Sequence, residues 1–388
     1  MLDKGMDKEK LFEKLFDYKK MDLDYASGKI LGSMCTKPDP IALEAYKLFI
    51  ETNLGDPGLF TGTALMEREV IGVLGELLHL FNPSGHIVTG GTEANLMAMA
   101  VAKKLFLENH EGVPEVILPE SAHFSFKKIT SMLSLKPVYV PLNDEYKTDV
   151  SVIESLINDN TMAIVAIAGT TELGLVDDIE KISEIAYKNN IYLHIDAAFG
   201  GFIIPFLEYD NEHALNFDFK CKGVSSITID PHKMGLAPVP AGGIIFRYSE
   251  HLEKLAVETP YLTKDKQTTI VGTRSGAGTA AIWTLLNYYG KEGYKKTVTQ
   301  AIKLTNYTYE KLLDMENINV TCKPELNIIS FTSNIKSPKQ VKQELYEYGW
   351  RISVSANPYA MRLVLMPHVK QEHIDNFLKD LNEILKRE

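Results

Sequence analysis

Short apolar runs alternate with helical patterns through the middle of the chain. Two segments, 93–109 and 177–189, repeat their apolar positions with the period of an amphipathic helix. Runs rich in Val and Ile, with the length of strands, occupy seven further segments: 86–90, 115–119, 137–142, 163–169, 191–198, 225–230 and 242–247. Apolar strands that alternate with helices indicate a mostly parallel sheet covered on both faces, and therefore an α/β fold.

The C-terminal part of the chain follows a different pattern. After about residue 285 the sequence predicts a long helix over roughly 290–315 and then three strands, at 327–333, 350–355 and 361–367. The chain closes on a helix whose apolar residues, from Ile374 to Leu385, share one stripe. These elements predict a small α+β layer.

The N-terminal part predicts an amphipathic helix over residues 7–19. A chain of 388 residues is long enough for a large domain and a smaller one. We therefore expect a helical segment at 1–50, a large domain at 51–285 and a small C-terminal domain at 286–388.

Composition and charge exclude several classes of function. The net charge is −10, which suits a nucleic-acid binder poorly, because binding phosphates requires clustered Lys and Arg. No apolar run approaches the length of a membrane span, and the charged N-terminus lacks the apolar core of a secretion signal. Cys35, Cys221 and Cys322 lie far apart, without a CxxC or HExxH motif, so we expect reduced thiols in a cytoplasm and no metal site.

The motif VTGGTEAN, residues 88–95, follows a predicted strand and opens a predicted helix. Gly90 and Gly91 let the backbone approach an anion, while Thr92 and the first amides of the helix can donate to a phosphate. Thr89 could add a hydroxyl donor. The motif is neither a Rossmann fingerprint nor a P-loop, and an ordinary strand-to-helix turn is the alternative interpretation.

Two further motifs place charged residues at the ends of apolar strands. Asp196, in HIDAAFGG, lies where α/β folds bind ligands, and it needs a cationic or donor partner such as a protonated ring nitrogen; a helix cap or an ion pair is the alternative. Lys233, in DPHKMG, follows the next strand beside His232 and could act as a nucleophile toward a carbonyl, although most lysines are simply solvated. The phosphate loop, the Asp and the Lys in this order are more specific than any one of them.

In this order, TGGTEAN, HIDAAFGG and DPHKMG resemble the pyridoxal-phosphate (PLP) dependent group II amino-acid decarboxylases. These enzymes have the aspartate-aminotransferase-like PLP fold (fold type I). The resemblance runs from about residue 30 to the end and includes NLGDPGLF, SAHFSF, GTTELG, GTRSG and RLVLMPH. It is nearest to the archaeal members that act on tyrosine and aspartate in methanofuran and coenzyme A biosynthesis.

The resemblance assigns cofactor residues one at a time. Lys233 would hold PLP as a Schiff base, Asp196 would pair with its ring nitrogen, and His123 would stack on its ring, unless it is a capped loop histidine. Ser225 or Thr228, together with His232, would help to hold the phosphate, Ala198 would contact the cofactor, and Thr171 would donate to it unless it only forms a turn. Gly272 and Thr273, in GTRSG, would reach the phosphate of a neighbouring subunit, which implies an obligate homodimer with shared active sites.

The resemblance also assigns substrate residues. Arg362 would grip the α-carboxylate with a bidentate fork, with Arg351 as its competitor. Tyr261 would return a proton to Cα, unless it is only an exposed loop residue. Four residues are candidates for the wall of the side-chain pocket: Met34, Asn53, Asp56 and Phe60.

The implied reaction is α-decarboxylation of an L-amino acid. Tyrosine to tyramine is the first expectation, aspartate to β-alanine the second, and glutamate an alternative substrate. A PLP-dependent carbon–carbon lyase, such as a sphingosine-phosphate lyase, is the alternative enzyme. A desulfurase would need a cysteine on a flexible loop, which Cys221 and Cys322 do not provide, and a PLP-binding regulator would need an attached DNA-binding module.

Overall fold

A seven-stranded, mostly parallel sheet forms the centre of the protein in the computed structural model, which describes residues 4–207 and 215–387. The strand order is β1-β7-β6-β5-β4-β2-β3, and β7 runs antiparallel to both of its neighbours while the other pairs are parallel. The strands are β1 (Ser84–Val88), β2 (Glu115–Pro119), β3 (Lys136–Val140), β4 (Thr161–Ile167), β5 (Tyr192–Asp196), β6 (Val224–Ile229) and β7 (Gly242–Phe246). Each lies within two residues of a strand that the sequence predicts.

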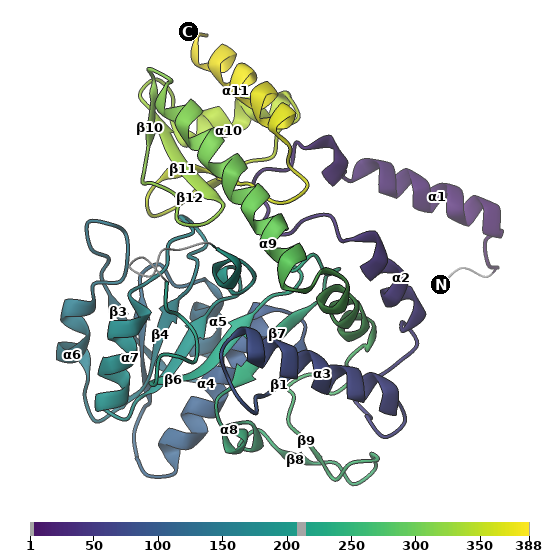
Figure 1. Ribbon diagram of the computed structural model, residues 1–388, viewed down its shortest axis with the longest axis vertical. Coiled ribbons are helices and arrows are strands. Elements are labelled where there is room, and N and C mark those ends of the chain that lie inside the picture. The colour runs from purple at the N-terminus through teal and green to yellow at the C-terminus, as the bar shows by residue number, and fades with distance from the viewer. Residues whose placement is uncertain (1–3, 208–214, 388) are drawn as a thin grey trace.

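Helices cover both faces of this sheet (Figure 1). One apolar cluster joins one face to α3 and α7, and a second cluster joins the other face to α4 and α5. Successive strand residues such as Ile164 and Val165 belong to different clusters, because neighbouring side chains of a strand point to opposite faces. The helices of this layer are α3 (Thr61–Leu77), α4 (Gly91–Leu107), α5 (Ser125–Met132), α6 (Ile153–Leu156), α7 (Ile179–Lys188) and α8 (Ser249–Glu253).

A second, four-stranded sheet lies in the C-terminal part, in the order β10-β11-β13-β12, with every pair antiparallel. The closing helix buries its apolar stripe against this sheet in a third cluster, as its pattern predicts. The elements are β10 (Ile318–Val320), β11 (Ile328–Ser333), α10 (Pro338–Glu347), β12 (Ser353–Ser355), β13 (Ala360–Val364) and α11 (Gln371–Leu385).

Helix α9 (Ala277–Leu313) runs from the large sheet to the small one (Figure 1). It begins well before residue 290, where the sequence predicts its start. Gly290, with a φ of 55°, lies outside the helical region and divides α9 into two helices that meet at a kink, and the helix predicted from about residue 290 corresponds to the second of them. The proposed domain division at residue 285 lies inside α9, which would therefore connect the two domains.

The N-terminal helix α1 (Lys8–Met21) extends away from the rest of the chain (Figure 1). It forms as its pattern predicts, but none of its residues is buried, and the Phe16 side chain is 61% exposed. The next helix, α2 (Pro40–Leu48), packs on α9. In the part of the chain that the structure describes, no helix has both the length and the apolar character to cross a membrane.

Candidate active site

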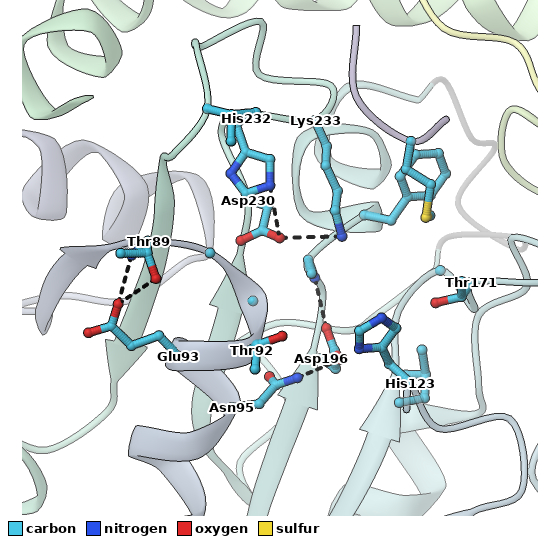
Figure 2. Close-up of a pocket in the computed structure, with 18 residues that line it drawn as sticks. Thr89, Thr92, Glu93, Asn95, His123, Thr171, Asp196, Asp230, His232 and Lys233 are labelled. Atoms are coloured by element: carbon cyan, nitrogen blue, oxygen red, sulfur yellow. Dashed lines mark hydrogen bonds and ion pairs between the residues drawn. The ribbon is translucent and has the colours of Figure 1, made fainter. Parts of the chain in front are cut away.

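A cavity of about 320 Å³ opens at the carboxyl edge of the large sheet. Strands β1, β4, β5 and β6 all end at this edge, which is where open α/β sheets bind ligands. Lys233 and Asp196 point into the same space from opposite sides (Figure 2). The cavity brings together these expected residues: Met34, Thr89, Gly90, Gly91, Thr92, His123, Thr171, Asp196, Ala198, His232 and Lys233.

Lys233 shares this space with a buried carboxylate that the sequence analysis did not single out. Its Nζ lies 3.3 Å from Oδ2 of Asp230, and Nε2 of His232 lies 3.7 Å from the same oxygen. Asp230 is 2% exposed, and its other oxygen is buried without a hydrogen-bond partner. A buried charge requires a counter-ion, so Asp230 and Lys233 fix one another. The signal for Asp230 was its place at the end of an apolar strand, the same signal that identified Asp196.

The carboxylate of Asp196 is held by two hydrogen bonds. Its Oδ1 accepts from the Ala198 backbone N–H at 3.1 Å, and its Oδ2 accepts from Nδ2 of Asn95 at 2.9 Å (Figure 2). Asn95 is 1% exposed and comes from the second turn of α4. It was also missed in the sequence, where it lies inside the predicted phosphate motif. Asp196 thus faces the cavity in one fixed orientation.

The start of α4 supplies open amides. Gly90 has φ 155° and ψ −179°, a backbone conformation that only glycine adopts readily, and no side chain caps the helix. The first amides of an uncapped helix have no partner inside it and suit an anion. The hydroxyl of Thr89, in contrast, donates to Glu93 at 2.7 Å, so it is not free for a phosphate as the sequence analysis allowed.

His123 lies on the other side of the cavity, beside Asp196 (Figure 2). Burial lowers the pKa of His123, and the charge of Asp196 only partly opposes this effect. The Nδ1 atom accepts from the Ser125 backbone N–H at 3.3 Å, which leaves the ring hydrogen on Nε2. A neutral imidazole can lie against an aromatic ring without placing an unpaired charge there.

Two residues that the resemblance assigned to the cofactor lie outside the cavity. Ser225 is the second residue of β6 and lines a different cavity with Tyr192 and Arg247, at the opposite edge of the sheet. It cannot reach a ligand at the carboxyl edge, so we drop this assignment. Thr228 is fully buried beneath the cavity, where its hydroxyl donates to Oδ1 of Asn95 at 2.7 Å.

Six more expected residues gather in a second place, formed by residues 53–60 and 261–275, which we call the loop patch. They are Asn53, Asp56, Phe60, Tyr261, Gly272 and Thr273, and none of them lines the cavity of Lys233. Hydrogen bonds join the two segments: the Leu54 N–H donates to the Arg274 carbonyl at 2.7 Å, and the Thr263 N–H donates to Oδ1 of Asp56 at 3.1 Å. Gly272 and Thr273 are exposed, and Tyr261 is 84% exposed.

A buried ion pair anchors the loop patch to the large sheet. Arg274 is 9% exposed and binds both carboxylate oxygens of Glu67, and it also donates to the Ile87 carbonyl at 2.7 Å. Burial works to raise the pKa of Glu67, but the hydrogen bond with His86 and the charge of Arg274 outweigh it and lower that pKa. Glu67 therefore stays charged, and the ion pair holds the segment that follows Gly272 and Thr273.

Arg362 has open donors. It is 7% exposed, and its Nη1 donates to Oγ of Ser353 at 2.9 Å, while its Nε and Nη2 are buried without a partner. Burial lowers its pKa to about 10, and the charge of Glu172 opposes this shift. Arg351 is already engaged, because its guanidinium lies 3.5 Å from the ring centre of Tyr346 and donates to backbone carbonyls. The geometry favours Arg362 over Arg351 for a carboxylate.

Comparison with known proteins gives one consistent result. A family model described as the pyridoxal-dependent decarboxylase conserved domain matches residues 60–334. The chain is 67% identical, over 100% of both chains, to a probable L-tyrosine/L-aspartate decarboxylase of Methanosphaera stadtmanae. It is 49% identical, over 98% of each chain, to an L-aspartate/L-glutamate decarboxylase of Pyrococcus horikoshii. The chain belongs to the pyridoxal-dependent decarboxylase family.

Membership of this family confirms PLP as the cofactor and amino-acid decarboxylation as the activity. A solved sphingosine-1-phosphate lyase of Burkholderia pseudomallei superposes with a TM-score of 0.91 at 26% identity, over 100% of this chain and 92% of that one. This match agrees with the expected fold type I. Because the sequence relatives at higher identity are decarboxylases, the carbon–carbon lyase alternative is not supported.

The polar groups that line the cavity of this decarboxylase match the functional groups of PLP. The open amides of α4 suit the phosphate, the amine of Lys233 suits the aldehyde, and the carboxylate of Asp196 suits a protonated ring nitrogen. A Cβ atom on Gly91 would lie 3.1 Å from Oδ2 of Asp230 and 3.2 Å from Cβ of Ala198, so glycine keeps that end of the cavity open.

Proposed function

We propose that this decarboxylase removes the α-carboxylate of L-tyrosine and of L-aspartate, in a cytoplasm. The observation that carries the substrate assignment is the 67% identity, over the whole chain, with a relative named for both substrates. Glutamate is the second candidate, because the relative at 49% identity is named for aspartate and glutamate. By the resemblance, tyramine would serve methanofuran biosynthesis and β-alanine would serve coenzyme A biosynthesis. The three unpaired cysteines fit a reducing compartment.

Lys233, Asp196 and His123 would hold the cofactor. Lys233 would carry it covalently, Asp196 would keep a proton on its ring nitrogen, and His123 would cover one face of its ring. Bound PLP supplies the electron-accepting ring that makes cleavage of the bond between Cα and the carboxylate feasible. The two hydrogen bonds to Asp196 support this role, because they hold its charge at one position.

Arg362 would hold the substrate α-carboxylate. Its two buried, unpartnered nitrogens give a guanidinium that lacks an acceptor, and a carboxylate would satisfy both. It lies beside the N-terminal segment that enters the cavity, because its Nη1 also contacts the Gly32 carbonyl at 3.3 Å and Met34 lines the cavity. The fork would orient the bond to be broken perpendicular to the cofactor ring.

The loop patch would complete the cavity of a second copy of the chain, which makes the active species a homodimer. Gly272 and Thr273 would donate to the neighbour's phosphate, Asn53 and Phe60 would contribute to its side-chain pocket, and Tyr261 would return the proton to Cα. Two observations support this proposal. These residues do not line the cavity of their own chain, and the Arg274–Glu67 ion pair anchors the base of the patch although its tip is exposed.

Product analysis tests the proposed substrates. The purified protein would be incubated separately with tyrosine, aspartate, glutamate and phenylalanine, and the products would be identified by mass spectrometry. We expect tyramine and β-alanine, and little product from phenylalanine, because a buried partner of the tyrosine hydroxyl would be left unpaired. A preference for glutamate would replace the substrate assignment, and cleavage at Cβ would contradict decarboxylation.

A further inference from the structure

A hydrogen-bonded series of buried polar side chains, which we call the polar network, lies beneath the cavity. On β5, residues Tyr192, His194 and Asp196 lie at alternate positions and so share one face of the sheet. On β6, Ser226 and Thr228 share the same face, and the strand register pairs His194 with Ser226 and Asp196 with Thr228. All five are less than 9% exposed. These polar positions interrupt strands that are otherwise apolar, so they need a reason other than packing.

The hydrogen bonds of the polar network are continuous from Asp196 to Tyr192. Nδ2 of Asn95 donates to Asp196 at 2.9 Å, and Oδ1 of Asn95 lies 2.9 Å from Nε2 of His194. On the other side of the ring, Nδ1 of His194 lies 2.8 Å from Oγ of Ser226. The hydroxyl of Tyr192 then donates to Ser226 at 2.8 Å.

The direction of every bond follows from the carboxylate. An ionised carboxylate only accepts, so Asn95 must turn its NH₂ group toward Asp196 and its carbonyl oxygen toward His194. Because that oxygen also only accepts, the hydrogen of the neutral imidazole must lie on Nε2. Nδ1 of His194 then accepts from the Ser226 hydroxyl, which in turn accepts from Tyr192. All hydrogens therefore point toward Asp196.

The ionisation behaviour of the members agrees with this direction. Burial lowers the pKa of His194 to about 4, even though the charge of Asp196 opposes the shift, so the ring is neutral at physiological pH. Burial raises the pKa of Tyr192 far above its ordinary value, so its hydroxyl keeps the hydrogen that it donates. Hydrogen bonds that follow one another in one direction polarise one another in a low-dielectric interior.

We propose that His194 is a positioning residue, which acts through Asn95 to hold the carboxylate of Asp196 in place and stabilise its charge opposite the cofactor ring. This inference rests on the proposed role of Asp196. Thr228 supports the same arrangement, because its hydroxyl donates to the carbonyl oxygen of Asn95 alongside His194. Without the His194 donor, the carbonyl oxygen of Asn95 keeps only the Thr228 hydroxyl, so the amide is held less firmly and Asp196 loses part of its orientation.

The first test measures PLP binding by absorbance titration of protein from which the cofactor has been removed. His194→Phe keeps an aromatic ring near Phe126, whose ring centre lies 6.3 Å from that of His194, but removes the donor to Asn95. We expect the dissociation constant for PLP to rise about tenfold. In His194→Gln, a side-chain amide can donate to Asn95 in place of Nε2, so binding should stay within about twofold of the unaltered protein. Unchanged binding in His194→Phe, or equally weak binding in both variants, would overturn the proposal.

The second test reads the tautomer of His194 directly in the unaltered protein. In holoenzyme labelled with ¹⁵N-histidine, NMR should show a neutral ring with its hydrogen on Nε2 at pH 7. A hydrogen on Nδ1, or a charged ring, would contradict the proposed direction of the hydrogen bonds in the polar network. His194→Gln, which removes the resonance, assigns the signal.

A matched control separates a positional effect from a loss of stability. Ser226→Ala removes a hydroxyl within the polar network. Ser183→Ala removes a hydroxyl of α7 that is also buried but accepts a hydrogen bond from the Gly223 backbone N–H, outside the polar network. Both should lower the melting temperature, but only Ser226→Ala should weaken PLP binding, by about threefold. Equal PLP binding in the two variants would overturn the proposal.

Failure of this inference differs from failure of the role of Asp196. If Asp196→Asn binds PLP as tightly as the unaltered protein and retains full activity, the role of Asp196 fails, and the positioning role of His194 fails with it. If Asp196→Asn is impaired while His194→Phe is not, only the positioning role is excluded.

Discussion

The cavity around Lys233 and the loop patch both contain expected site residues, but the carboxylates of the cavity are buried and the candidates of the loop patch lie at an exposed tip. The cavity is built from strand ends of one sheet, and its charged groups, Asp196 and Asp230, are buried and paired within the chain. The loop patch holds its functional candidates at an exposed tip, while Glu67 and Arg274 anchor its base. The first gathers its candidates in one cavity within the chain, whereas the second places its candidates away from that cavity.

This difference indicates how the proposed active site would divide its tasks. Groups that must keep a fixed charge next to the cofactor lie on strands, where burial and register determine their positions. Groups that would close the site against water lie on a loop, where a second copy of the chain can bring them into place. Assembly would then control access to a cofactor site that each chain already forms.

The largest expected effect comes from Lys233→Ala in the cavity. Turnover should fall by about four orders of magnitude or more, because the covalent anchor of the cofactor is lost. The fold should persist, although Asp230 would keep only His232 as a nearby partner. Activity assays and a melting curve check both statements, and borohydride reduction of the unaltered protein should fix PLP to Lys233. Lys222→Ala, at the exposed amino edge of the sheet, should behave as the unaltered protein.

Mixed dimers test whether the cavity and the loop patch of different chains form one site. Thr273→Glu should inactivate the protein by itself, because a carboxylate would repel the phosphate. Heterodimers of Lys233→Ala and Thr273→Glu chains, purified with two tags, should regain about half of the normal activity, since one of the two symmetric sites is intact.

The control pairs Lys233→Ala with Asp196→Asn, two changes within the same cavity. In that heterodimer each site carries one lesion, so the activity should stay at the level of the inactive parents. No recovery in the first mixture would mean that the patch serves its own chain, whereas recovery in the control would mean that Lys233 and Asp196 of one chain do not act in the same site.

A smaller effect is expected at Arg362, which lies outside both the cavity lining and the loop patch. Arg362→Ala should raise KM about a hundredfold for tyrosine and for aspartate alike, because both carry the α-carboxylate. Arg351→Ala should change KM less than about twofold, because its guanidinium is engaged by Tyr346. A KM change confined to one substrate would place Arg362 in the side-chain pocket instead.

The sequence predicts most of the fold because its signals are local. Apolar runs identify all seven strands of the large sheet, and the stripes of α1, α7 and α11 are regular. The part of α9 before Gly290 was not predicted, because a kink at Gly290 separates it from the predicted helix. β10 and α10 were not predicted: β10 has only three residues, and α10 has few apolar residues, although Pro338, Val341 and Leu345 are all buried.

The site was predictable only in part, because some of its contacts join distant segments. Strand ends identified Lys233 and Asp196, and the same rule would have rejected Ser225, which lies near the start of its strand. Asn95 and His194 become visible only when α4 is placed over β5, although the alternation of Tyr192, His194 and Asp196 in an apolar strand was a readable signal. The separation of Gly272 and Thr273 from the cavity depends on tertiary structure.

The smallest expected effect is on stability in mild acid, where the cavity and the loop patch should differ. The folded protein lowers the pKa of His194 from 6.5 to about 4, chiefly by burial, so the unfolded chain binds more protons between these values. Stability should therefore fall as the pH drops below 6.5, by up to about 1.4 kcal/mol per pH unit from this group. Asp196 and Tyr192, the titratable neighbours of the ring, stay unchanged in a His194→Gln variant.

Glu67 in the loop patch also has a lowered pKa, but from an ordinary value of 4.5, so its contribution should be lost only below that pH. With the cofactor removed, melting temperatures would be measured from pH 7.5 to 4 for the unaltered chain, His194→Gln and Glu67→Gln. His194→Gln should lose less stability between pH 6.5 and 4.5 than the unaltered chain does. Glu67→Gln should be less stable throughout but should keep the unaltered slope in that window, because Glu67 is ionised in both states there. Equal slopes for His194→Gln and the unaltered chain would show that the ring gains a proton in the fold as easily as in the unfolded chain, and would remove the buried neutral histidine from beneath the cavity.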